Sequence, residues 1–272
     1  MSKTDFEKHF LSIYKTRWES LYQALLADEK QKVMISEHEF KPKIQSFGHT
    51  YEYDQSAVED DKAYALDLAS VVVADQFKNT EEGLFLDMCS APGGKALYSL
   101  LNYNYSEYIF NDLSKQRLKR LTRVLKNYSS KDNYRVYNHD ASRWGQFYPN
   151  TYDSILLDAP CSGERHLLEN PSELEKWSAK RSKRLQKRQL ALICSAYDAL
   201  KPNGELVYST CSISPLENEE LIYAFQKKRK GFKIDFNTYD FCEPVDVGAY
   251  ILPDKTQGLG PIFYTRILKG SD

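Results

Sequence analysis

Apolar residues recur at spacings of three and four through the first part of the chain. The pattern is carried by Phe6, Phe10, Ile13, Tyr14, Trp18, Leu21, Leu25 and Leu26. Such spacing is typical of a helix that buries one face, so we predict that residues 1 to about 40 are helical. Residues 63–73 form a further apolar run, for which we predict another helix. We therefore expect a helical N-terminal extension over residues 1–62, packed against a main body that follows it.

From residue 84 onward the pattern changes to short apolar runs separated by longer amphipathic segments. Each run is too short for a helix of its own and suits a strand that is buried on both faces. The runs cover residues 84–88, 108–112, 134–137, 152–158 and 205–209, with two last strands expected over 247–252 and 262–268. The helices predicted between and after them cover residues 96–101, 114–128, 173–200 and 217–230. This alternation predicts an α/β fold with a doubly wound, mostly parallel sheet over residues 63–272.

A glycine turn follows the first of these strands. Pro92, Gly93 and Gly94 interrupt the apolar run, and a helix is expected to resume at Ala96. Strand, glycine turn and helix open a nucleotide-binding unit, because glycines let a ligand approach the backbone and the helix start offers free N–H groups. A purely structural tight turn has a similar sequence, so the turn by itself leaves both interpretations open.

Acidic residues end several of the predicted strands. Asp87, Asp112, Asp140 and Asp158 fall at carboxyl ends, which is where ligands bind in sheets of this kind. Asp112 lies about twenty residues beyond the glycine turn, the spacing at which a carboxylate can accept hydrogen bonds from a ribose. Asp140 suits either a contact with the exocyclic amine of an adenine or a cap on a helix that starts at Ser142, and the sequence leaves both open.

Two cysteines join these acids at the predicted edge of the sheet. Cys161 and Cys211 each follow a strand and stand beside Pro, Ser or Thr, whereas Cys194 lies in an apolar stretch and is expected to be packing. Two thiols beside a carboxylate suit attack on a pyrimidine. A thiolate that adds to carbon 6 of cytosine enables carbon 5 to accept a methyl group. The ring nitrogen then becomes electron-rich, and Asp158 can provide its hydrogen-bonding partner. A base must afterwards remove the carbon-5 proton so that the thiolate leaves.

Four segments carry a family resemblance: Cys89–Lys95, Asn111–Ser114, Asp158–Gly163 and Tyr208–Ser214. Together they resemble the Sun/Fmu family of RNA cytosine-C5 methyltransferases, and the likeness runs from about Tyr64 to Leu268. It implies a Rossmann-like fold dependent on S-adenosylmethionine, with Cys211 as nucleophile, Cys161 in product release, and Lys95 and Asp158 near the target base. The residues that it places at or around the cofactor are Cys89, Ser90, Ala91, Pro92, Gly93, Gly94, Lys95, Asp112, Arg117, Asp140 and Asp158.

Further segments resemble the branch that includes the mitochondrial ribosomal-RNA methyltransferase. They are Arg165–Leu167, the basic stretch that ends at Arg188-Gln189, and Val247-Gly248 with Gly260–Phe263. This likeness favours ribosomal RNA as the substrate, with tRNA as the alternative. Ala96 stands where the family commonly has a hydroxyl residue, and the usual bacterial Asp-Gly-Phe-Phe segment is missing. A catalytically silent RNA-binding assembly factor would lack a key residue, and an amino-group methyltransferase would need no thiol.

Basic residues are concentrated between residues 176 and 188. This stretch holds Lys176, Lys180, Arg181, Lys183, Arg184, Lys187 and Arg188, several of which share one helical face. A solvated helix face has the same pattern, but the absence of acids over residues 178–188 favours contact with RNA phosphates. We assign Arg165, Lys180, Arg181, Lys183 and Arg184 to RNA binding. Trp177 suits either the core, which we prefer, or a stacking platform for a base. The target base must leave its stack to reach a thiol, so single-stranded or loop RNA is expected.

Composition narrows the class of protein. Over 272 residues, 37 Lys and Arg nearly cancel 38 Asp and Glu, so any basic surface must be local. Five cysteines without a CxxC pair argue against a disulfide scaffold and against a zinc site, so no metal is expected. The chain shows neither a signal-peptide core nor an apolar run of membrane-spanning length. We expect a cytoplasmic protein with no membrane contact.

Overall fold

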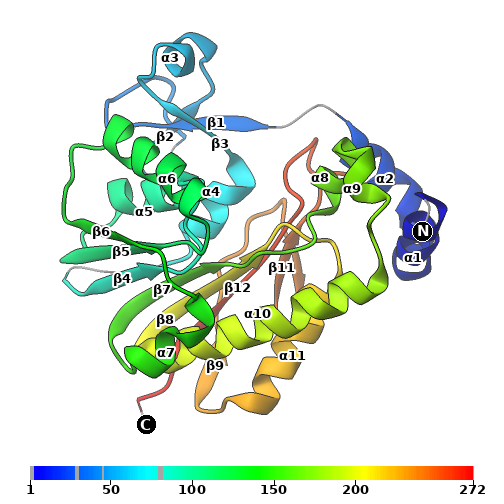
Figure 1. Cartoon of the computed structure of the whole chain (residues 1–272). Helices are drawn as coiled ribbons and strands as arrows, with labels where there is room; N and C mark the ends of the chain where they lie inside the picture. The colour runs from blue at the N-terminus through cyan, green and yellow to red at the C-terminus, as the bar shows by residue number, and fades with distance from the viewer. Residues whose placement is uncertain (1–2, 28–30, 45, 79–81, 272) are drawn as a thin grey trace.

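The computed structural model describes residues 3–27, 31–44, 46–78 and 82–271. A nine-stranded sheet forms its centre, with helices on both faces (Figure 1). The strand order is β10-β11-β12-β8-β7-β4-β5-β6, with β9 paired to β12. The pairs from β8 to β6 are parallel, and those that involve β9 to β12 are antiparallel. The predicted doubly wound, mostly parallel α/β fold is therefore confirmed.

The bounds of the sheet strands agree closely with the apolar runs, except that the strand predicted over 205–209 already begins at Leu200. They are β4 (Leu84–Asp87), β5 (Glu107–Asn111), β6 (Tyr134–Tyr137), β7 (Tyr152–Asp158), β8 (Leu200–Thr210), β9 (Phe232–Ile234), β10 (Glu243–Val245), β11 (Gly248–Ile251) and β12 (Ile262–Lys269). The strands β9 and β10 have only three residues each and were not predicted. Runs of three residues give no periodicity that could reveal a strand.

Helices of very different length connect these strands. They are α4 (Leu68–Ala74), α5 (Gly94–Asn102), α6 (Lys115–Tyr128), η2 (Ala141–Arg143), α7 (Trp144–Phe147), α8 (Glu164–Glu169), α9 (Pro171–Leu174), α10 (Ala179–Ala199), η3 (Pro215–Glu217) and α11 (Glu219–Lys228). Within the part of the chain that the structure describes, no helix is both long and apolar enough to cross a membrane.

Alternate residues of the central strands point to opposite faces and so build two apolar cores. Leu86 and Ile155 join a core with α10 and α11 on one face. Their chain neighbours Phe85 and Leu156 join a second core with α4, α5 and α6 on the other face. Both cores are dry, because all four of these side chains have 0% of their surface exposed. The ends of β4 and β7 are thereby held rigidly where the site is built.

The N-terminal extension is only partly helical, which corrects the prediction. The helices α1 (Lys3–Tyr14) and α2 (Trp18–Leu26), joined by η1 (Lys15–Arg17), are present. They are followed by a small sheet of β1 (Lys32–Ile35), β2 (Thr50–Glu52) and β3 (Tyr64–Asp67), with the short helix α3 (Gln55–Glu59) between β2 and β3. The apolar run Val33–Ile35 is buried by pairing with both neighbours, which a helix could not offer. The predicted domain boundary after residue 62 divides this sheet, because β1 comes before residue 62 in the chain and β3 comes after it.

Two predicted helices also have bounds that differ from the prediction. The run at 63–73 starts as β3, and α4 begins only at Leu68, because the Asp67 carboxylate caps it by accepting from the Ala69 amide at 2.7 Å. The helix predicted over 173–200 is divided into α9 and α10, because Ser178 caps the start of α10 by accepting from the Arg181 amide. Trp177 lies between the two helices, only 3% exposed, and its ring packs on Phe6 at 5.3 Å. The prediction that Trp177 belongs to the core is confirmed.

Candidate active site

The loop after β4 is tied to the neighbouring strand β5 by one serine. The Ser90 amide donates to the Asn111 carbonyl at 2.8 Å, and its hydroxyl accepts from the Asn111 amide at 2.9 Å. The same hydroxyl donates to the carbonyl of Asp87 at 2.8 Å. Gly93 has a φ of +121°, and a Cβ on Gly94 would lie 2.5 Å from Cδ1 of Leu66. The φ of Gly93 therefore favours glycine at that position, whereas the contact at Gly94 is with the flexible end of Leu66. The backbone of the loop faces a small cleft lined by residues 89–95.

A buried acid supports this loop from below. Asp87 ends β4 and is 1% exposed, and its carboxylate accepts a hydrogen bond from the Cys89 amide at 3.2 Å. Burial, together with repulsion from Asp158, raises the pKa of Asp87 to about 8. Burial likewise raises the pKa of the Cys89 thiol, which is thereby kept neutral. These two side chains shape the loop and contribute no free charge to it at neutral pH.

Asp112 presents an acceptor that the protein itself does not use. One carboxylate oxygen accepts from the Ser114 amide at 2.8 Å. The other, Oδ2, lies 3.1 Å from an Arg117 guanidinium nitrogen but makes no hydrogen bond with the described residues, although it is buried. A buried acceptor without a hydrogen bond is costly unless a ligand supplies the donor. With the bare glycine backbone beside it, this oxygen fits the ribose hydroxyls of S-adenosylmethionine.

Two other predicted cofactor residues, Arg117 and Asp140, make contacts within the protein itself. Arg117 donates to the carbonyl of Ala91 and so holds α6 against the glycine loop. The Asp140 carboxylate accepts from the Ser142 amide at 3.0 Å and from its hydroxyl at 2.8 Å, which are the bonds of a helix cap. These bonds lower the pKa of Asp140. The capping role is therefore confirmed, and a contact between Asp140 and an adenine amine stays a prediction.

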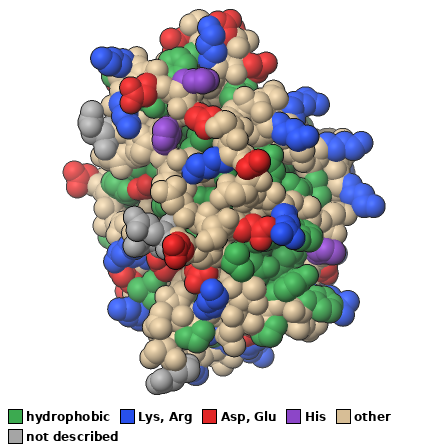
Figure 2. Space-filling view, turned by 90° about the vertical axis from the view of Figure 1, so that its left-hand side faces the viewer, with side chains coloured by type: hydrophobic (Ala, Val, Ile, Leu, Met, Phe, Trp, Pro, Cys, Tyr) green, Lys and Arg blue, Asp and Glu red, His purple; other side chains and the backbone are tan. Residues whose placement is uncertain are grey.

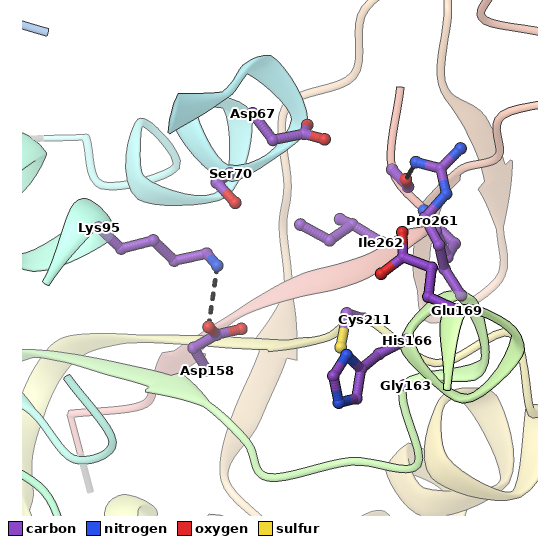
Figure 3. A pocket seen from close by; sticks show the side chains of 12 residues that line it. Asp67, Ser70, Lys95, Asp158, Gly163, His166, Glu169, Cys211, Pro261 and Ile262 are labelled. Atoms are coloured by element: carbon purple, nitrogen blue, oxygen red, sulfur yellow. Dashed lines mark hydrogen bonds and ion pairs between the residues drawn. The ribbon is translucent and has the colours of Figure 1, made fainter. Parts of the chain in front are cut away.

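A second cleft opens beside the glycine loop, and a lysine and an aspartate meet in it (Figure 3). The Lys95 ammonium, from the first turn of α5, lies 2.8 Å from Oδ2 of Asp158 at the end of β7. The Ser209 hydroxyl donates to the other oxygen of Asp158 at 2.7 Å. Burial by itself lowers the pKa of Lys95, but the charge of Asp158 and its hydrogen bond outweigh burial and raise it. Lys95 therefore stays protonated and fixes the Asp158 carboxylate.

The two predicted cysteines are neighbours in space. Cys161 and Cys211 are 50 residues apart in sequence, yet their sulfur atoms lie 2.9 Å apart. They meet because β7 and β8 are adjacent parallel strands that end at the same edge of the sheet. Cys211 is exposed and faces the cleft, whereas Cys161 lies behind it. The hydrogen bond with Cys211, followed by burial, raises the pKa of Cys161, so this sulfur keeps its proton at neutral pH.

The cleft contains further residues that were not assigned a role from the sequence. It has a volume of about 360 Å³, within the range of roughly 300–1,000 Å³ that small-molecule sites have. Besides Lys95, Asp158 and Cys211, and Arg165, which was assigned to RNA binding, it is lined by Asp67, Ser70, Gly163, His166, Glu169 and Gly260–Ile262. Asp67 and Ser70 come from the N-terminal end of α4, so a helix remote in sequence closes one side of the cleft (Figure 3). No motif in the sequence pointed to Asp67 or Ser70.

Arg165 makes contacts within the protein that were not predicted from the sequence. It was assigned to RNA, but its side chain is buried and its guanidinium donates to backbone carbonyls of Ala24, Leu25, Gly258 and Gly260. These carbonyls come from α2 and from the loop before β12, so Arg165 connects three distant segments. Four of the five N–H groups of the guanidinium are taken up in this way, which gives Arg165 a structural role. These contacts do not support the assignment of Arg165 to RNA binding, which stays a prediction.

The other basic residues do share one surface. Lys180, Lys183, Arg184 and Lys187 line a shallow hollow along α10, and all four are exposed. Arg181 lies to one side, 3.7 Å from Glu173. The helix α10 itself contacts the loop that holds Cys161, because the side-chain amide of Gln189, on the buried side of the helix, donates to the carbonyl of Pro160 at 3.0 Å. We call these residues the α10 basic face.

Basic residues also gather elsewhere on the protein. Figure 2 shows Lys and Arg side chains along one margin of a second face, at the height of α6 in Figure 1. The helix α6 exposes Lys119, Arg120, Arg123 and Lys126. A basic helix is therefore not in itself a mark of function. What distinguishes α10 is that its residue Gln189 is hydrogen-bonded to Pro160 in the loop that holds Cys161.

Two buried glutamates lie beneath the cysteine loops and were not assigned from the sequence. Glu164 opens α8 and Glu217 ends η3, and both are 0% exposed. They follow the two site cysteines by three and six positions. In the sequence, the only sign of these two buried residues is that an acid follows each cysteine. This sign is weak, because most glutamates are exposed to solvent. Among the described residues, no group of three or more His, Cys, Asp or Glu side chains is placed to hold a metal ion.

Curated relatives share the central part of the chain. It is 33% identical over 230 residues to the 5-cytosine rRNA methyltransferase NSUN4 of Xenopus laevis, a match that covers 76% of this chain and 56% of that protein. It is 36% identical over 165 residues to the ribosomal RNA small subunit methyltransferase F of Aeromonas salmonicida (strain A449), covering 60% and 34% of the two chains. The chain thus spans little more than half the length of the NSUN4 relatives that it matches.

Solved structures agree with this likeness. NSun6 from Pyrococcus horikoshii, solved with SFG, superposes with a TM-score of 0.68 at 28% identity, over 82% of this chain and 58% of that one. A methyltransferase homolog from Pyrococcus horikoshii gives a TM-score of 0.76 at 19% identity, over 96% and 93%, and shows the shared fold alone.

The family model described as 16S rRNA methyltransferase RsmB/F matches residues 74–267. This segment contains the glycine loop, Asp112, the Lys95–Asp158 pair and both cysteine loops. The resemblance to the Sun/Fmu family, near the NSUN4 branch, is confirmed, and S-adenosylmethionine is the cofactor that such a site takes. The chain belongs to the 16S rRNA methyltransferase RsmB/F family.

Proposed function

We propose that this protein transfers a methyl group from S-adenosylmethionine to carbon 5 of a cytosine in RNA, through a covalent bond between Cys211 and carbon 6. The observation that carries the proposal is the pair of sulfur atoms 2.9 Å apart, one of them exposed in a cleft that also holds Lys95 and Asp158. An amino-group methyltransferase has no use for two adjacent thiols. The printed names of the relatives support RNA cytosine as the target.

Each side chain of the cleft has a distinct task in this reaction. The Cys211 sulfur adds to carbon 6, and the electron pair displaced toward the ring nitrogen is stabilised by a hydrogen bond from the Asp158–Lys95 pair. S-adenosylmethionine supplies the methyl group that carbon 5 then takes. Removal of the carbon-5 proton restores the ring double bond as the Cys211 sulfur leaves. Cys161 is the nearest candidate base, but it can take this proton only as the thiolate, so its own thiol proton must first pass to solvent in the open cleft.

The α10 basic face is proposed to hold the RNA strand beside the cleft. Exposed Lys and Arg side chains contact phosphates without reading sequence. The cleft admits a single base, so the target must be unstacked, as in a loop or single strand. Ribosomal RNA is the substrate that the printed names of the relatives favour, and tRNA is the alternative.

The test is transfer of a labelled methyl group from S-adenosylmethionine to separate pools of ribosomal RNA and tRNA, followed by mapping of 5-methylcytosine. We expect label at carbon 5 of cytosine in ribosomal RNA. Label in tRNA alone would change the substrate but keep the chemistry. Label on an adenine amine, or cofactor binding without any transfer, would overturn the proposal, and the second result would point to a silent RNA-binding protein.

A further inference from the structure

The two buried glutamates link the cysteine loops to each other in a reciprocal way. Glu164 follows Cys161 in the chain, yet its Oε2 accepts from the amide of Ile213, two residues after Cys211, at 3.0 Å. Glu217 follows Cys211 in the chain, yet its Oε2 accepts from the amide of Ser162, directly after Cys161, at 3.0 Å. Each acid thus reaches from its own loop to the other one. The distance between the two sulfur atoms depends on this exchange.

Two serines complete the arrangement. The hydroxyls of Ser162 and Ser212, which directly follow the two cysteines, lie 3.0 Å apart. The Ser162 hydroxyl contacts Oε1 of Glu164 and lies 2.5 Å from Oε1 of Glu217. The Ser212 hydroxyl lies 3.2 Å from the same oxygen of Glu164. The four side chains form one buried cluster beneath both thiols, which we call the carboxyl pair with its serines.

Counting hydrogens shows that one carboxyl must be protonated. The Ser162 hydroxyl is within hydrogen-bond distance of both glutamates but has a single hydrogen, so it can donate to only one of them. The other contact is attractive only if that carboxyl is itself the donor. Two ionised carboxylates that share one hydroxyl in a buried site would repel each other. The geometry therefore requires one proton between the two acids.

The donors around each acid show which of them holds the proton. Glu217 is surrounded by donors, because its Oε2 accepts from the Ser162 amide and from Nε2 of Gln189 at 2.8 Å. Its Oε1 takes the Ser162 hydrogen. Glu164 accepts from the Ile213 amide on Oε2 and also from its own amide, but its Oε1 faces two serine hydroxyls that can accept. The proton accordingly belongs on Oε1 of Glu164, with Glu217 as the carboxylate.

We propose that Glu164 and Glu217 are positioning residues that hold the Cys161 and Cys211 thiols together only while Glu164 carries a proton, so that loss of this proton separates the two loops. The proposal rests on the methyl-transfer function and adds a pH limit to it. Burial, with the charge of Glu217, raises the pKa of Glu164 to about 7, which agrees with a resident proton. The other titratable groups that act on the pair are Cys161, Tyr14 from α1, whose hydroxyl donates to the Ile213 carbonyl at 2.6 Å, and Tyr208 from β8.

The variants Glu164→Gln and Glu217→Leu make changes with opposite expected results. An amide at 164 can accept from Ile213 and donate to Ser162, so it imitates the protonated acid. Leucine at 217 removes both acceptor oxygens and leaves the Ser162 and Gln189 N–H donors without a partner. We expect E164Q to keep most of the single-turnover methyl transfer below pH 7. We expect E217L to lose about tenfold or more at every pH.

The pH profile separates positioning from a merely structural role. As pH rises past the Glu164 pKa, wild type loses the proton and E164Q does not. With a pKa of about 7, the ratio of E164Q to wild-type rate should rise about fivefold between pH 7 and pH 8. The ratio cancels the pH dependence of the thiols, which both proteins share. A raised pKa in the folded state also means that stability is lost as pH rises from about 4.5, the ordinary value, through about 7, so the wild-type melting temperature should fall relative to E164Q between about pH 4.5 and pH 7.

Glu220→Gln is the matched control, because Glu220 is exposed on the adjoining helix α11. It should follow wild type in rate and melting at each pH. S-adenosylmethionine binding should be equal in all four proteins, which confirms that they are folded. A flat ratio of E164Q to wild type, or an E217L protein as active as E164Q, would overturn the proposal. Absence of transfer by wild type would instead refute the proposed function.

Discussion

The cofactor loop and the cysteine cleft lie side by side but are built in different ways. The loop is a single stretch, residues 87–95, and it offers mainly backbone, which its own glycines and Ser90 hold in place. The cleft is assembled from remote residues, since Lys95 and Asp158 are 63 positions apart and the two cysteines 50. Its side chains depend on a buried network beneath them.

Because of this difference, the loop and the cleft should respond differently to substitution. A ligand site made of backbone is changed chiefly by side chains that do not fit, because the hydrogen-bonding groups are present in every residue. A site made of side chains loses its chemistry when one atom is replaced, and its geometry when a supporting contact is removed. Substitutions should therefore have local and graded effects at the loop but decisive effects at the cleft.

The largest effect is expected at the two sulfur atoms. Cys211→Ser removes the attacking thiol, so it should be inactive and form no bond to RNA. Cys161→Ser should still add and methylate but fail to remove the carbon-5 proton, so protein attached to methylated RNA should accumulate. A denaturing gel with labelled RNA distinguishes the two. Trapping by Cys211→Ser would reverse the roles, and full activity of both variants would refute the thiol mechanism.

The next largest effect is expected at the α10 basic face. Replacing Lys180, Lys183, Arg184 and Lys187 by Ala should weaken RNA binding and reduce the slope of log affinity against log salt by about 0.7 for each phosphate that is no longer neutralised. The matched control replaces Lys119, Arg120, Arg123 and Lys126 on α6, which removes the same charge. Equal slopes for the two variants would mean that only net charge matters and that α10 is an ordinary solvated face.

A smaller effect tests the cofactor side. Asp112→Ala removes the unused acceptor and should weaken S-adenosylmethionine binding about tenfold or more, because a hydrogen bond to a charged group is worth roughly 1.5–3 kcal/mol. Calorimetry measures this directly. Asp140→Ala serves as comparison, since the Asp140 carboxylate is already occupied by Ser142. If Asp140→Ala weakened binding as strongly, that acid would also contact the cofactor.

The smallest effect on function is expected at Arg165. Arg165→Lys cannot reproduce the donors that reach four carbonyls, so we expect a melting temperature lower by about 2–4 °C for a loss of about 1 kcal/mol. The salt slope of RNA binding should be unchanged, because the guanidinium faces the interior. A reduced slope with unchanged melting would support the assignment of Arg165 to RNA binding.

Much of the fold and part of the site could be predicted from local patterns. The alternation of short apolar runs with amphipathic helices predicts the parallel sheet, because strands buried on both faces must be apolar throughout. The glycine turn and Asp112 are recognisable because their geometry depends on residues close in sequence. The edge at which Asp87, Asp158, Cys161 and Cys211 meet also follows, since parallel strands end at one edge.

Other features were decided only by tertiary structure. The run at residues 32–35 became a strand because partners from residues 50–52 and 64–67 were available to pair with it. Arg165 has a side chain that is suited to binding phosphate, yet its guanidinium donates to backbone carbonyls from two remote segments. The proton count at Glu164 and Glu217 arises from a single serine hydroxyl placed between them. A sequence records which groups a chain carries, whereas burial and the identity of the neighbouring donors decide what each group can do, and both are set by segments far apart in the chain.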